Sequence, residues 1–203
     1  MRRVFLLSPA STHGRRAQLL FREAAAFPLA LELRAGGSSV GEVFSFLSGL
    51  YFRGKLTYAR AFAPVPRTVP PVLVITPDRG LVSPDLRITL EDLTAFSRSP
   101  VDIANPRYRE PLERDARGIS EAVQDDVEVI LLGSIATGKY ADLLRPVLAD
   151  RLVFPSQFVG RGDMSRGGLL LRAMDAGVEL EYVPVFSGAN RRGKRPPRLE
   201  PRK

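Results

Sequence analysis

The chain has 203 residues, of which 44% are hydrophobic and 26% are charged, which suits one compact domain with a buried core. It contains no cysteine and one histidine, His13, which excludes disulfide bonds and thiolate nucleophiles and makes a zinc site improbable. No apolar run approaches the ~20 residues that a membrane span requires, so we expect no membrane partner and take a cytoplasmic location as the default.

In chain order, the first half predicts a strand at 4–7, a helix over 15–33 that Pro28 breaks or kinks, a helix over about 40–63, and a strand at 72–76 that ends in a tight turn at 77–80. The second half predicts a short helix within 86–98 after an extended entry, a helix at about 109–124, a strand at 127–132 and a helix at 137–148. A strand at 151–154, a helix from 163 or 165 to 176 and an edge strand at 180–185 follow.

Strands that alternate with helices imply a mainly parallel sheet that is covered on both faces. We therefore predict an α/β fold, a three-layer sandwich around a mainly parallel central sheet of about four or five strands. In such sheets ligands bind at the carboxyl ends of the strands. The polar segments of this sequence follow its predicted strands, which places a candidate cleft at that end of the sheet.

The net charge of +8 is concentrated at the C-terminal end of the chain. From residue 189 onward there are seven basic residues and one acid, a charge of +6, so residues 1–188 carry only +2. We predict a single domain over 1–188 and a basic, disordered tail over 189–203. Such a tail binds nucleic-acid phosphates through counterion release or serves only to keep the chain soluble. The first alternative uses Arg191, Arg192, Lys194 and Arg195.

A glycine-rich loop over 158–172 lies between a predicted strand and the last predicted helix. Backbone N–H groups of such a loop, together with a helix N-terminus, favour anions. We expect a phosphate or another anion to be bound by Gly160, Arg161, Gly162, Ser165 and Arg166, with Asp163 as a base or a hydroxyl ligand. The alternative is structural, because Asp163 or Ser165 can cap the helix while the glycines permit close packing. The loop matches neither the Walker motif nor the dinucleotide fingerprint.

Other polar residues follow the remaining strands. They are candidate ligand-binding or catalytic groups: Ser8, His13, Asp78, Arg79, Ser134 and Thr137. Asp78 is a candidate general base, or else a turn aspartate that bonds its own backbone. Ser134 and Thr137 precede a predicted helix, so they either bind an anion or cap that helix. His13 is a further candidate base, or an incidental loop histidine.

The segment from Tyr51 to Arg60 interleaves aromatic and basic residues. Aromatic rings stack on bases and cations bind phosphates, so Arg53 and Lys55 are candidate nucleic-acid contacts. The alternative places Phe52 and Leu56 in the core and the charges on the solvent side.

Three segments, residues 50–59, 74–85 and 132–140, together resemble a broad bacterial domain family. In that family a tyrosine and a basic helix precede a strand that ends in Gly-Leu and a Pro-Asp turn, and a later strand leads to a tyrosine-bearing helix. The pattern is also similar to the central domain of archaeosine-forming tRNA-modification enzymes, which has a uracil-DNA-glycosylase-like fold. Thr76-Pro-Asp-Arg79 replaces the Ser-Ala-Lys-Tyr/His of the related domains. The resemblance implies a three-layer α/β fold and a bias towards nucleotides or nucleic acid.

These features predict a protein that binds a nucleotide or nucleic acid at the strand carboxyl ends and processes a base or a nucleoside as a hydrolase or transferase. Two alternatives remain open. One is a non-catalytic nucleic-acid-binding module that uses the basic tail, and the other is an enzyme that acts on a small phosphorylated metabolite. The sequence assigns no metal ligands and no cofactor.

Overall fold

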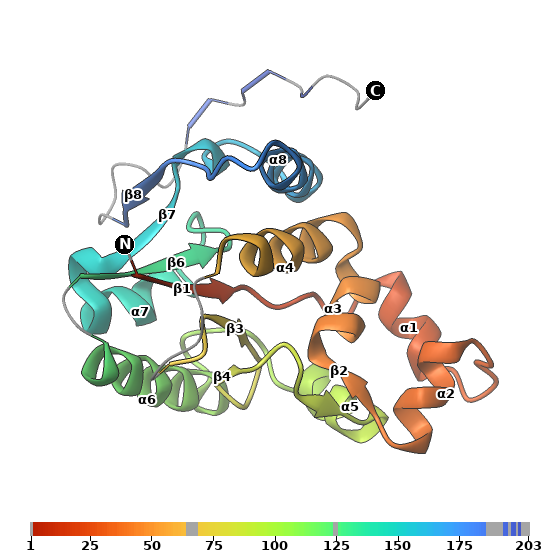
Figure 1. Cartoon of the computed structure of the whole chain (residues 1–203). Helices are drawn as coiled ribbons and strands as arrows, with labels where there is room; N and C mark the ends of the chain where they lie inside the picture. The colour runs from red at the N-terminus through yellow and green to blue at the C-terminus, as the bar shows by residue number, and fades with distance from the viewer. Residues whose placement is uncertain are drawn as a thin grey trace.

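The structure is a computed structural model that describes residues 2–63, 69–123 and 126–185, and five residues near the C-terminus: Gly193, Lys194, Pro196, Pro197 and Leu199. A six-stranded sheet crosses the molecule in the order β4-β3-β1-β6-β7-β8 (Figure 1). Its strands are β1 (Arg2–Leu7), β3 (Val72–Ile75), β4 (Leu81–Val82), β6 (Val127–Leu132), β7 (Leu152–Pro155) and β8 (Tyr182–Pro184). The four inner strands are parallel, and β4 and β8 are antiparallel edges. The predicted α/β fold with a mainly parallel sheet is confirmed.

Each face of the sheet carries its own hydrophobic core because the inner strands are apolar at every position of their central stretch. Along β1, Phe5 and Leu7 belong to one core, whereas Val4 and Leu6 belong to the other. All four side chains are at most 4% exposed. Burying a side chain of this size contributes roughly 1.5–3 kcal/mol, so both faces of the sheet need a layer of helices.

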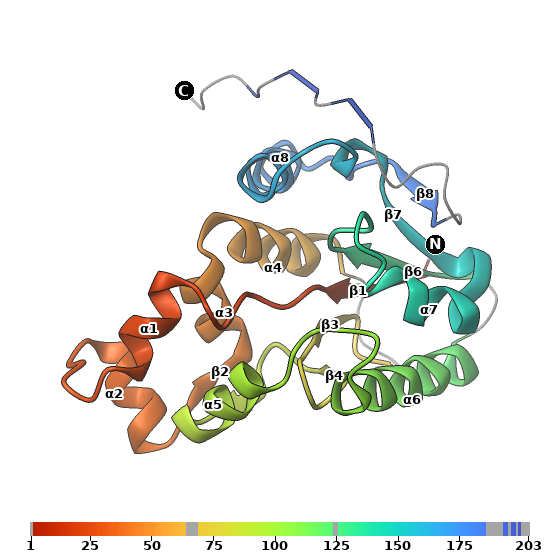
Figure 2. The same cartoon turned by 180° about the vertical axis from the view of Figure 1, so that it is seen from behind.

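Helices supply those two layers, as the opposite views show (Figures 1 and 2). One face is covered by α4 (Leu50–Phe62) and α8 (Asp163–Ala176), and the other by α6 (Pro106–Ala122) and α7 (Ala141–Leu148). Four further helices extend the α4 side beyond the carboxyl end of β1: α1 (Arg15–Phe21), α2 (Pro28–Ala35), α3 (Val40–Ser48) and α5 (Leu90–Arg98). A two-stranded ribbon, β2 (Ser38–Ser39) with β5 (Arg87–Ile88), lies among them. Short 3-10 turns, η1 (Ala149–Arg151) and η2 (Ser156–Phe158), flank β7.

Several predicted boundaries were wrong. The segment 15–33 is broken, as Pro28 predicted, but its first helix already ends at Phe21. Pro28 is the first residue of the second helix, where its missing N–H costs nothing. The segment 40–63 is divided at Gly49, whose φ of 59° interrupts the helix. The helix predicted from Thr137 begins only at Ala141. The sheet gains its sixth strand from β4, which with two residues is too short to show a periodic pattern.

Other predicted ends agree with the structure. Helix α8 stops at Gly177, whose φ of 65° is left-handed, and its N–H bonds the carbonyls of Ala173 and Met174. The last strand, β8, lies at an edge of the sheet, as the proline at position 184 predicted. Among the described residues, none of the helices combines the length and the apolar character needed to cross a bilayer.

Two glycines let α4 and α8 pack with their backbones in close contact. A Cβ on Gly54 would lie 2.9 Å from the carbonyl oxygen of Gly167, and a Cβ on Gly167 would lie 2.7 Å from that of Leu50. Both distances are shorter than van der Waals contact, and the obstructing atoms are backbone atoms that cannot move independently. The close approach of α4 to α8 therefore requires glycine at both positions.

We expect Gly167→Ala to lower the free energy of unfolding by about 1–3 kcal/mol, the usual effect of overpacking, measured by urea denaturation. Gly118→Ala is the matched control, because Gly118 is an exposed glycine of α6 with open space around its Cβ position. This control should stabilise the protein by roughly 0.5–1 kcal/mol through helix propensity. An equal rise in the free energy of unfolding of Gly167→Ala and Gly118→Ala would contradict the close contact between α4 and α8.

Candidate functional site

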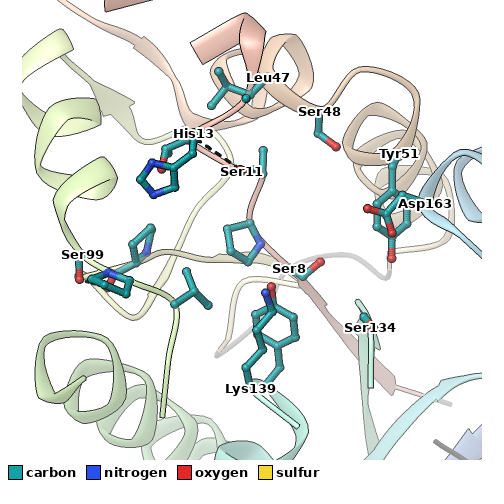
Figure 3. A pocket seen from close by; sticks show the side chains of 18 residues that line it. Ser8, Ser11, His13, Leu47, Ser48, Tyr51, Ser99, Ser134, Lys139 and Asp163 are labelled. Atoms are coloured by element: carbon teal, nitrogen blue, oxygen red, sulfur yellow. Dashed lines mark hydrogen bonds between the residues drawn. The ribbon is translucent and has the colours of Figure 1, made fainter. Parts of the chain in front are cut away.

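A cavity of about 490 Å³ opens where three neighbouring parallel strands end (Figure 3). Ser8 follows β1, Pro77 follows β3 and Ser134 follows β6, and all three residues line it. Its remaining walls are residues 9–14, Leu47, Ser48, Tyr51, Ser99, Pro100, Val101, Lys139, Tyr140 and Asp163. This volume lies within the usual range of small-molecule sites, roughly 300–1,000 Å³. The cavity therefore occupies the position where open parallel sheets bind ligands.

A buried lysine that is not part of the cavity wall contacts Ser8. Lys55, from α4, is only 1% exposed, and its Nζ donates hydrogen bonds to the backbone oxygen and to the Oγ of Ser8, the latter at 2.8 Å. The same nitrogen lies 4.5 Å from the ring centre of Tyr51 and 4.9 Å from that of Phe52. No carboxylate in the described part of the chain forms a salt bridge with it.

Burial lowers the pKa of the Lys55 amine from 10.5 to about 7. The charge of Arg166 adds to this shift, and the carboxylate of Asp163 opposes it. Near neutral pH a large fraction of Lys55 is therefore the uncharged amine, which has a free lone pair. A lysine in this state can accept a proton, which an exposed lysine rarely does at this pH.

Lys55 was expected to contact nucleic acid, and its burial rules out that role. The residue shares the apolar stripe of α4 with Phe52, Leu56 and Ala59, at the spacing i, i+3, i+4 and i+7. Arg53, on the opposite side of the helix, is exposed. Phe52 and Leu56 are buried in the core, as the alternative interpretation of this segment placed them. The spacing of Lys55 places it on the core-facing side of α4, whereas the alternative interpretation had placed the charges of this segment on the solvent side.

Tyr51 brings a buried hydroxyl to the cavity wall. The side chain is 5% exposed, and its oxygen has no hydrogen-bond partner among the described residues. Burial raises the pKa of this phenol, so it stays protonated at neutral pH. Arg166 lowers that pKa through its charge and through a donor contact to the phenol oxygen, although this contact does not meet strict hydrogen-bond geometry. A guanidinium can only donate, so the hydroxyl proton of Tyr51 lacks an acceptor among the described residues.

Of the candidates proposed from the sequence, the structure brings four together around the cavity: Ser8, His13, Ser134 and Asp163. Figure 3 shows Ser8 in the middle of this group, with His13 on the far side of the cavity from Ser134. His13 is exposed, and its backbone N–H donates to Ser11 Oγ at 3.3 Å. The side chain of Asp163 is 69% exposed.

Asp78 and Arg79 do not belong to this cavity. Pro77 lines it, but Asp78 and Arg79 face a separate, more open depression beside α6, together with Arg107. Burial raises the pKa of Asp78, against the charges of Arg79 and Arg107. The guanidinium of Arg79 pairs with Asp92 and lies over the ring of Phe96. Asp78 is therefore not positioned to act as a base in the cavity.

The glycine-rich loop also differs from the expected anion site. Arg161 donates to the carbonyls of Gln157 and Pro197 and to Ser165 Oγ, at 3.1–3.2 Å. Arg166 is buried, donating to the Phe158 carbonyl at 3.2 Å and to Asp163 at 3.5 Å.

Neither arginine lines the cavity, and neither do Gly160, Gly162 or Ser165. The cap of α8 is Gly162, without a side-chain cap. The predicted cap at Asp163 or Ser165 was therefore wrong, and close packing is the role that the structure gives to Gly167.

The remaining candidates lie elsewhere. Thr137 is an exposed turn residue outside the cavity wall. Arg53 lies in a shallow groove with Arg60 and Arg87. Lys194 is exposed, and its carbonyl approaches Gly160. Arg191, Arg192 and Arg195 lie outside the described residues.

Comparison with known proteins returned no match, whether with protein-family models, curated proteins or solved structures. Within the described residues there is also no cluster of three or more His, Cys, Asp or Glu side chains that could bind a metal ion. The function of the cavity is therefore argued from its own geometry.

The lowered pKa of Lys55 makes stability depend on pH in a defined direction. Between the pKa of about 7 in the folded protein and the ordinary lysine pKa of 10.5, the unfolded chain binds one proton more, so the free energy of unfolding rises with pH. The free energy of unfolding of the wild type, relative to that of Lys55→Met, should rise by up to about 1.4 kcal/mol per pH unit above pH 7. Below about pH 6 the difference between the two proteins should not change with pH.

Urea denaturation of both proteins between pH 5.5 and 9 measures this difference, and other titrating groups cancel in the comparison. A difference that stays constant over the whole range would mean that Lys55 keeps its charge in the folded state.

Proposed function

We propose that this protein is an enzyme of the hydrolase or transferase class that binds a small polar molecule of the nucleoside type in the cavity at the ends of β1, β3 and β6. The observation that carries the proposal is the hydroxyl of Tyr51, which lines the cavity and has no acceptor for its proton among the described residues. A buried hydroxyl without a partner costs about 1–3 kcal/mol. Such a group is readily explained if a ligand supplies the missing acceptor.

The chemistry of the walls supports a ligand with several polar groups. The carboxylate of Asp163 can accept hydrogen bonds from sugar hydroxyls or an exocyclic amine, and Tyr51 can donate to a carbonyl or a ring nitrogen. Ser134 and Lys139 add further polar groups, while Pro77, Pro100 and Val101 form an apolar part of the wall. A heterocyclic base joined to a sugar offers hydrogen-bonding groups for the polar part of the wall and a flat ring for its apolar part. The resemblance to archaeosine-forming enzymes favours the same class.

Catalysis, rather than binding alone, is supported by the buried amine that adjoins the cavity. Groups whose pKa is displaced by burial and that lie in a cleft are frequent at active sites. Lys55, with a pKa of about 7, can exchange a proton with a group in contact with it at physiological pH. Exposed lysines such as those of a nucleic-acid-binding surface lack this property.

We expect a nucleobase or nucleoside in a thermal-shift panel to raise the melting temperature of the wild type. A ligand at about 100 times its Kd adds about 2.7 kcal/mol, which corresponds to a shift of roughly 5–10 °C for a chain of this size. Tyr51→Phe should lose at least half of this shift. Its own melting temperature should equal or exceed that of the wild type, because the variant removes a buried polar atom that lacks a partner.

Tyr108→Phe is the matched control for stability. Tyr108 is as buried as Tyr51, but its hydroxyl donates to the Lys139 carbonyl at 2.8 Å, so this variant should lose about 1 kcal/mol. An equal loss in Tyr51→Phe would show that the Tyr51 hydroxyl has an internal partner. If no base, nucleoside or nucleotide of the panel raises the melting temperature of the wild type, the proposed nucleoside-type substrate is ruled out.

A further inference from the structure

Ser8 connects the buried amine to the cavity. Its Oγ accepts a hydrogen bond from Lys55 Nζ at 2.8 Å, and the same residue lines the open space. Lys55 itself does not form part of the wall. Ser8 is only 4% exposed but belongs to the wall, so a ligand in the cavity can touch Ser8, whereas Ser8 and Tyr51 separate it from Lys55.

We propose that Ser8 is a nucleophile, that Lys55 is its general base, and that the reaction transfers the acyl group of an ester or amide to the Ser8 Oγ. The proposal rests on the proposed function in one respect, namely that the substrate enters this cavity. It adds the bond that is broken and the residues that break it.

The two hydrogen bonds of Lys55 give it the geometry of a base. An uncharged amine has two N–H groups and one lone pair. In the uncharged amine, the bond to the Ser8 backbone oxygen holds one N–H, and the 2.8 Å contact with the Oγ reverses its direction, so that the Ser8 hydroxyl donates to the lone pair. The carbonyl thus orients the base, in the way that a third group orients the base of a catalytic triad.

The surroundings of Lys55 keep it able to accept a proton. Tyr51 and Phe52 of its own helix place aromatic rings against the nitrogen, and Asp163 and Arg166 of α8 are the charged groups that influence it. Their effects on the charge are opposite in sign, so burial decides the outcome and brings the pKa to about 7. Of the other candidate bases, Asp163 and His13 are exposed and have no hydrogen bond to Ser8 among the described residues.

In the first step, the Oγ of Ser8 forms a bond to the carbonyl carbon, the π electrons move to the carbonyl oxygen, and the Oγ proton moves to Lys55. The tetrahedral intermediate then re-forms the carbonyl and expels the alcohol or amine, which takes the proton from Lys55. Water attacks the acyl-serine in the same manner and releases the acid and free Ser8. The sum is ester or amide plus water giving acid plus alcohol or amine, with Lys55 returned to its uncharged form.

An acyl carbon suits this cavity better than a phosphoryl group. The carboxylate of Asp163 stands on the wall and would repel the negative charge of a phosphate ester. A carbonyl group is neutral before the attack. Tyr51 supplies a neutral hydrogen-bond donor whose proton is unused, which suits the oxygen of a carbonyl.

The test uses a fluorophosphonate probe, which reacts irreversibly with activated serines and needs no knowledge of the substrate. Intact-mass and peptide analysis of the full chain should show one adduct, on Ser8, and none in Ser8→Ala. The labelling rate of the wild type should rise about tenfold per pH unit below pH 7 and level off above it. Ser83→Ala, which removes an exposed serine outside the cavity wall, should react like the wild type.

Two lysine variants separate catalysis from structural support. Lys55→Met removes the base, and Lys55→Arg retains N–H donors for the Ser8 carbonyl but cannot accept a proton at these pH values. Each folded variant should label at least 100-fold more slowly and lose the pH dependence. With 4-nitrophenyl acetate, the wild type should form an acetyl-Ser8 that the variants do not form. If neither lysine variant folds, the pH dependence of labelling in the wild type and the absence of the adduct in Ser8→Ala still test the proposal.

Three results would overturn the assignment: an unlabelled Ser8 in the folded wild type, equal labelling of wild type and folded Lys55 variants, or a rate that does not change between pH 5.5 and 8. The labelling is independent of the nucleoside panel. Nucleosides that bind through Tyr51 while Ser8 is inert would refute the acyl-transfer proposal alone. A reactive Ser8 without any nucleoside shift would instead refute the proposed substrate class.

Discussion

The contact between Lys55 and Ser8 joins the helical layer to the central strand of the sheet. Lys55 lies on α4, and Ser8 is the first residue past the end of β1. An ammonium group without an ion pair is costly to bury, and the amine responds through a lowered pKa rather than through a partner charge. The hydrogen bonds to Ser8 satisfy the nitrogen and fix where β1 ends relative to α4. The floor of the cavity is thus defined by one buried polar contact.

The packing of α8 on α4 supports that contact. The close approach at Gly54 and Gly167 brings Asp163 and Arg166, in the first turn of α8, near the buried amine and Tyr51. Because burial is the largest cause of the lowered pKa of Lys55, we expect a wider spacing of the two helices to raise that pKa again. The glycines therefore contribute to the chemistry of the cavity indirectly, through the close packing of α4 and α8. The environment of Lys55 and the stability of the helix pair therefore both depend on the short distance between the backbones of α4 and α8.

Much of the fold could be predicted because several short segments indicate their own secondary structure without reference to the rest of the chain. The runs 72–75 and 129–132 are apolar on both faces, which is typical of a strand inside a covered sheet, and Gly177 marks a helix end by its conformational freedom. The division of α3 from α4 at Gly49 was missed because glycine also occurs within helices. Strand β4 was missed because two residues have no period.

The position of the cavity followed from the parallel sheet, since strand ends meet at one edge, and Ser8 and Ser134 lie on its wall. The tight turn after β3 was predicted, but Asp78 was misplaced because composition does not give the direction in which such a turn points its side chains. Thr76 Oγ1 donates to the Gly80 carbonyl and accepts from the Arg79 backbone N–H, which closes the turn tightly and sends the chain back as β4. The closed turn directs Asp78 towards α6 instead of towards β1.

Lys55 shows why a residue's role could not be read from its type. At i+3 on an apolar stripe, a lysine can extend its ammonium group past the neighbouring side chains into water or remain buried beneath them. The choice depends on what the opposing element offers, and here that element is the polar end of β1, 47 positions away in the sequence. The backbone carbonyl and hydroxyl of Ser8 accept from the nitrogen, so burial becomes tolerable without a counter-ion. The hydrogen bonds to Ser8 stabilise the buried amine of Lys55, and they also place that amine where it can accept the proton of the Ser8 hydroxyl. The same interaction therefore allows the burial and underlies the proposed reactivity of the pair.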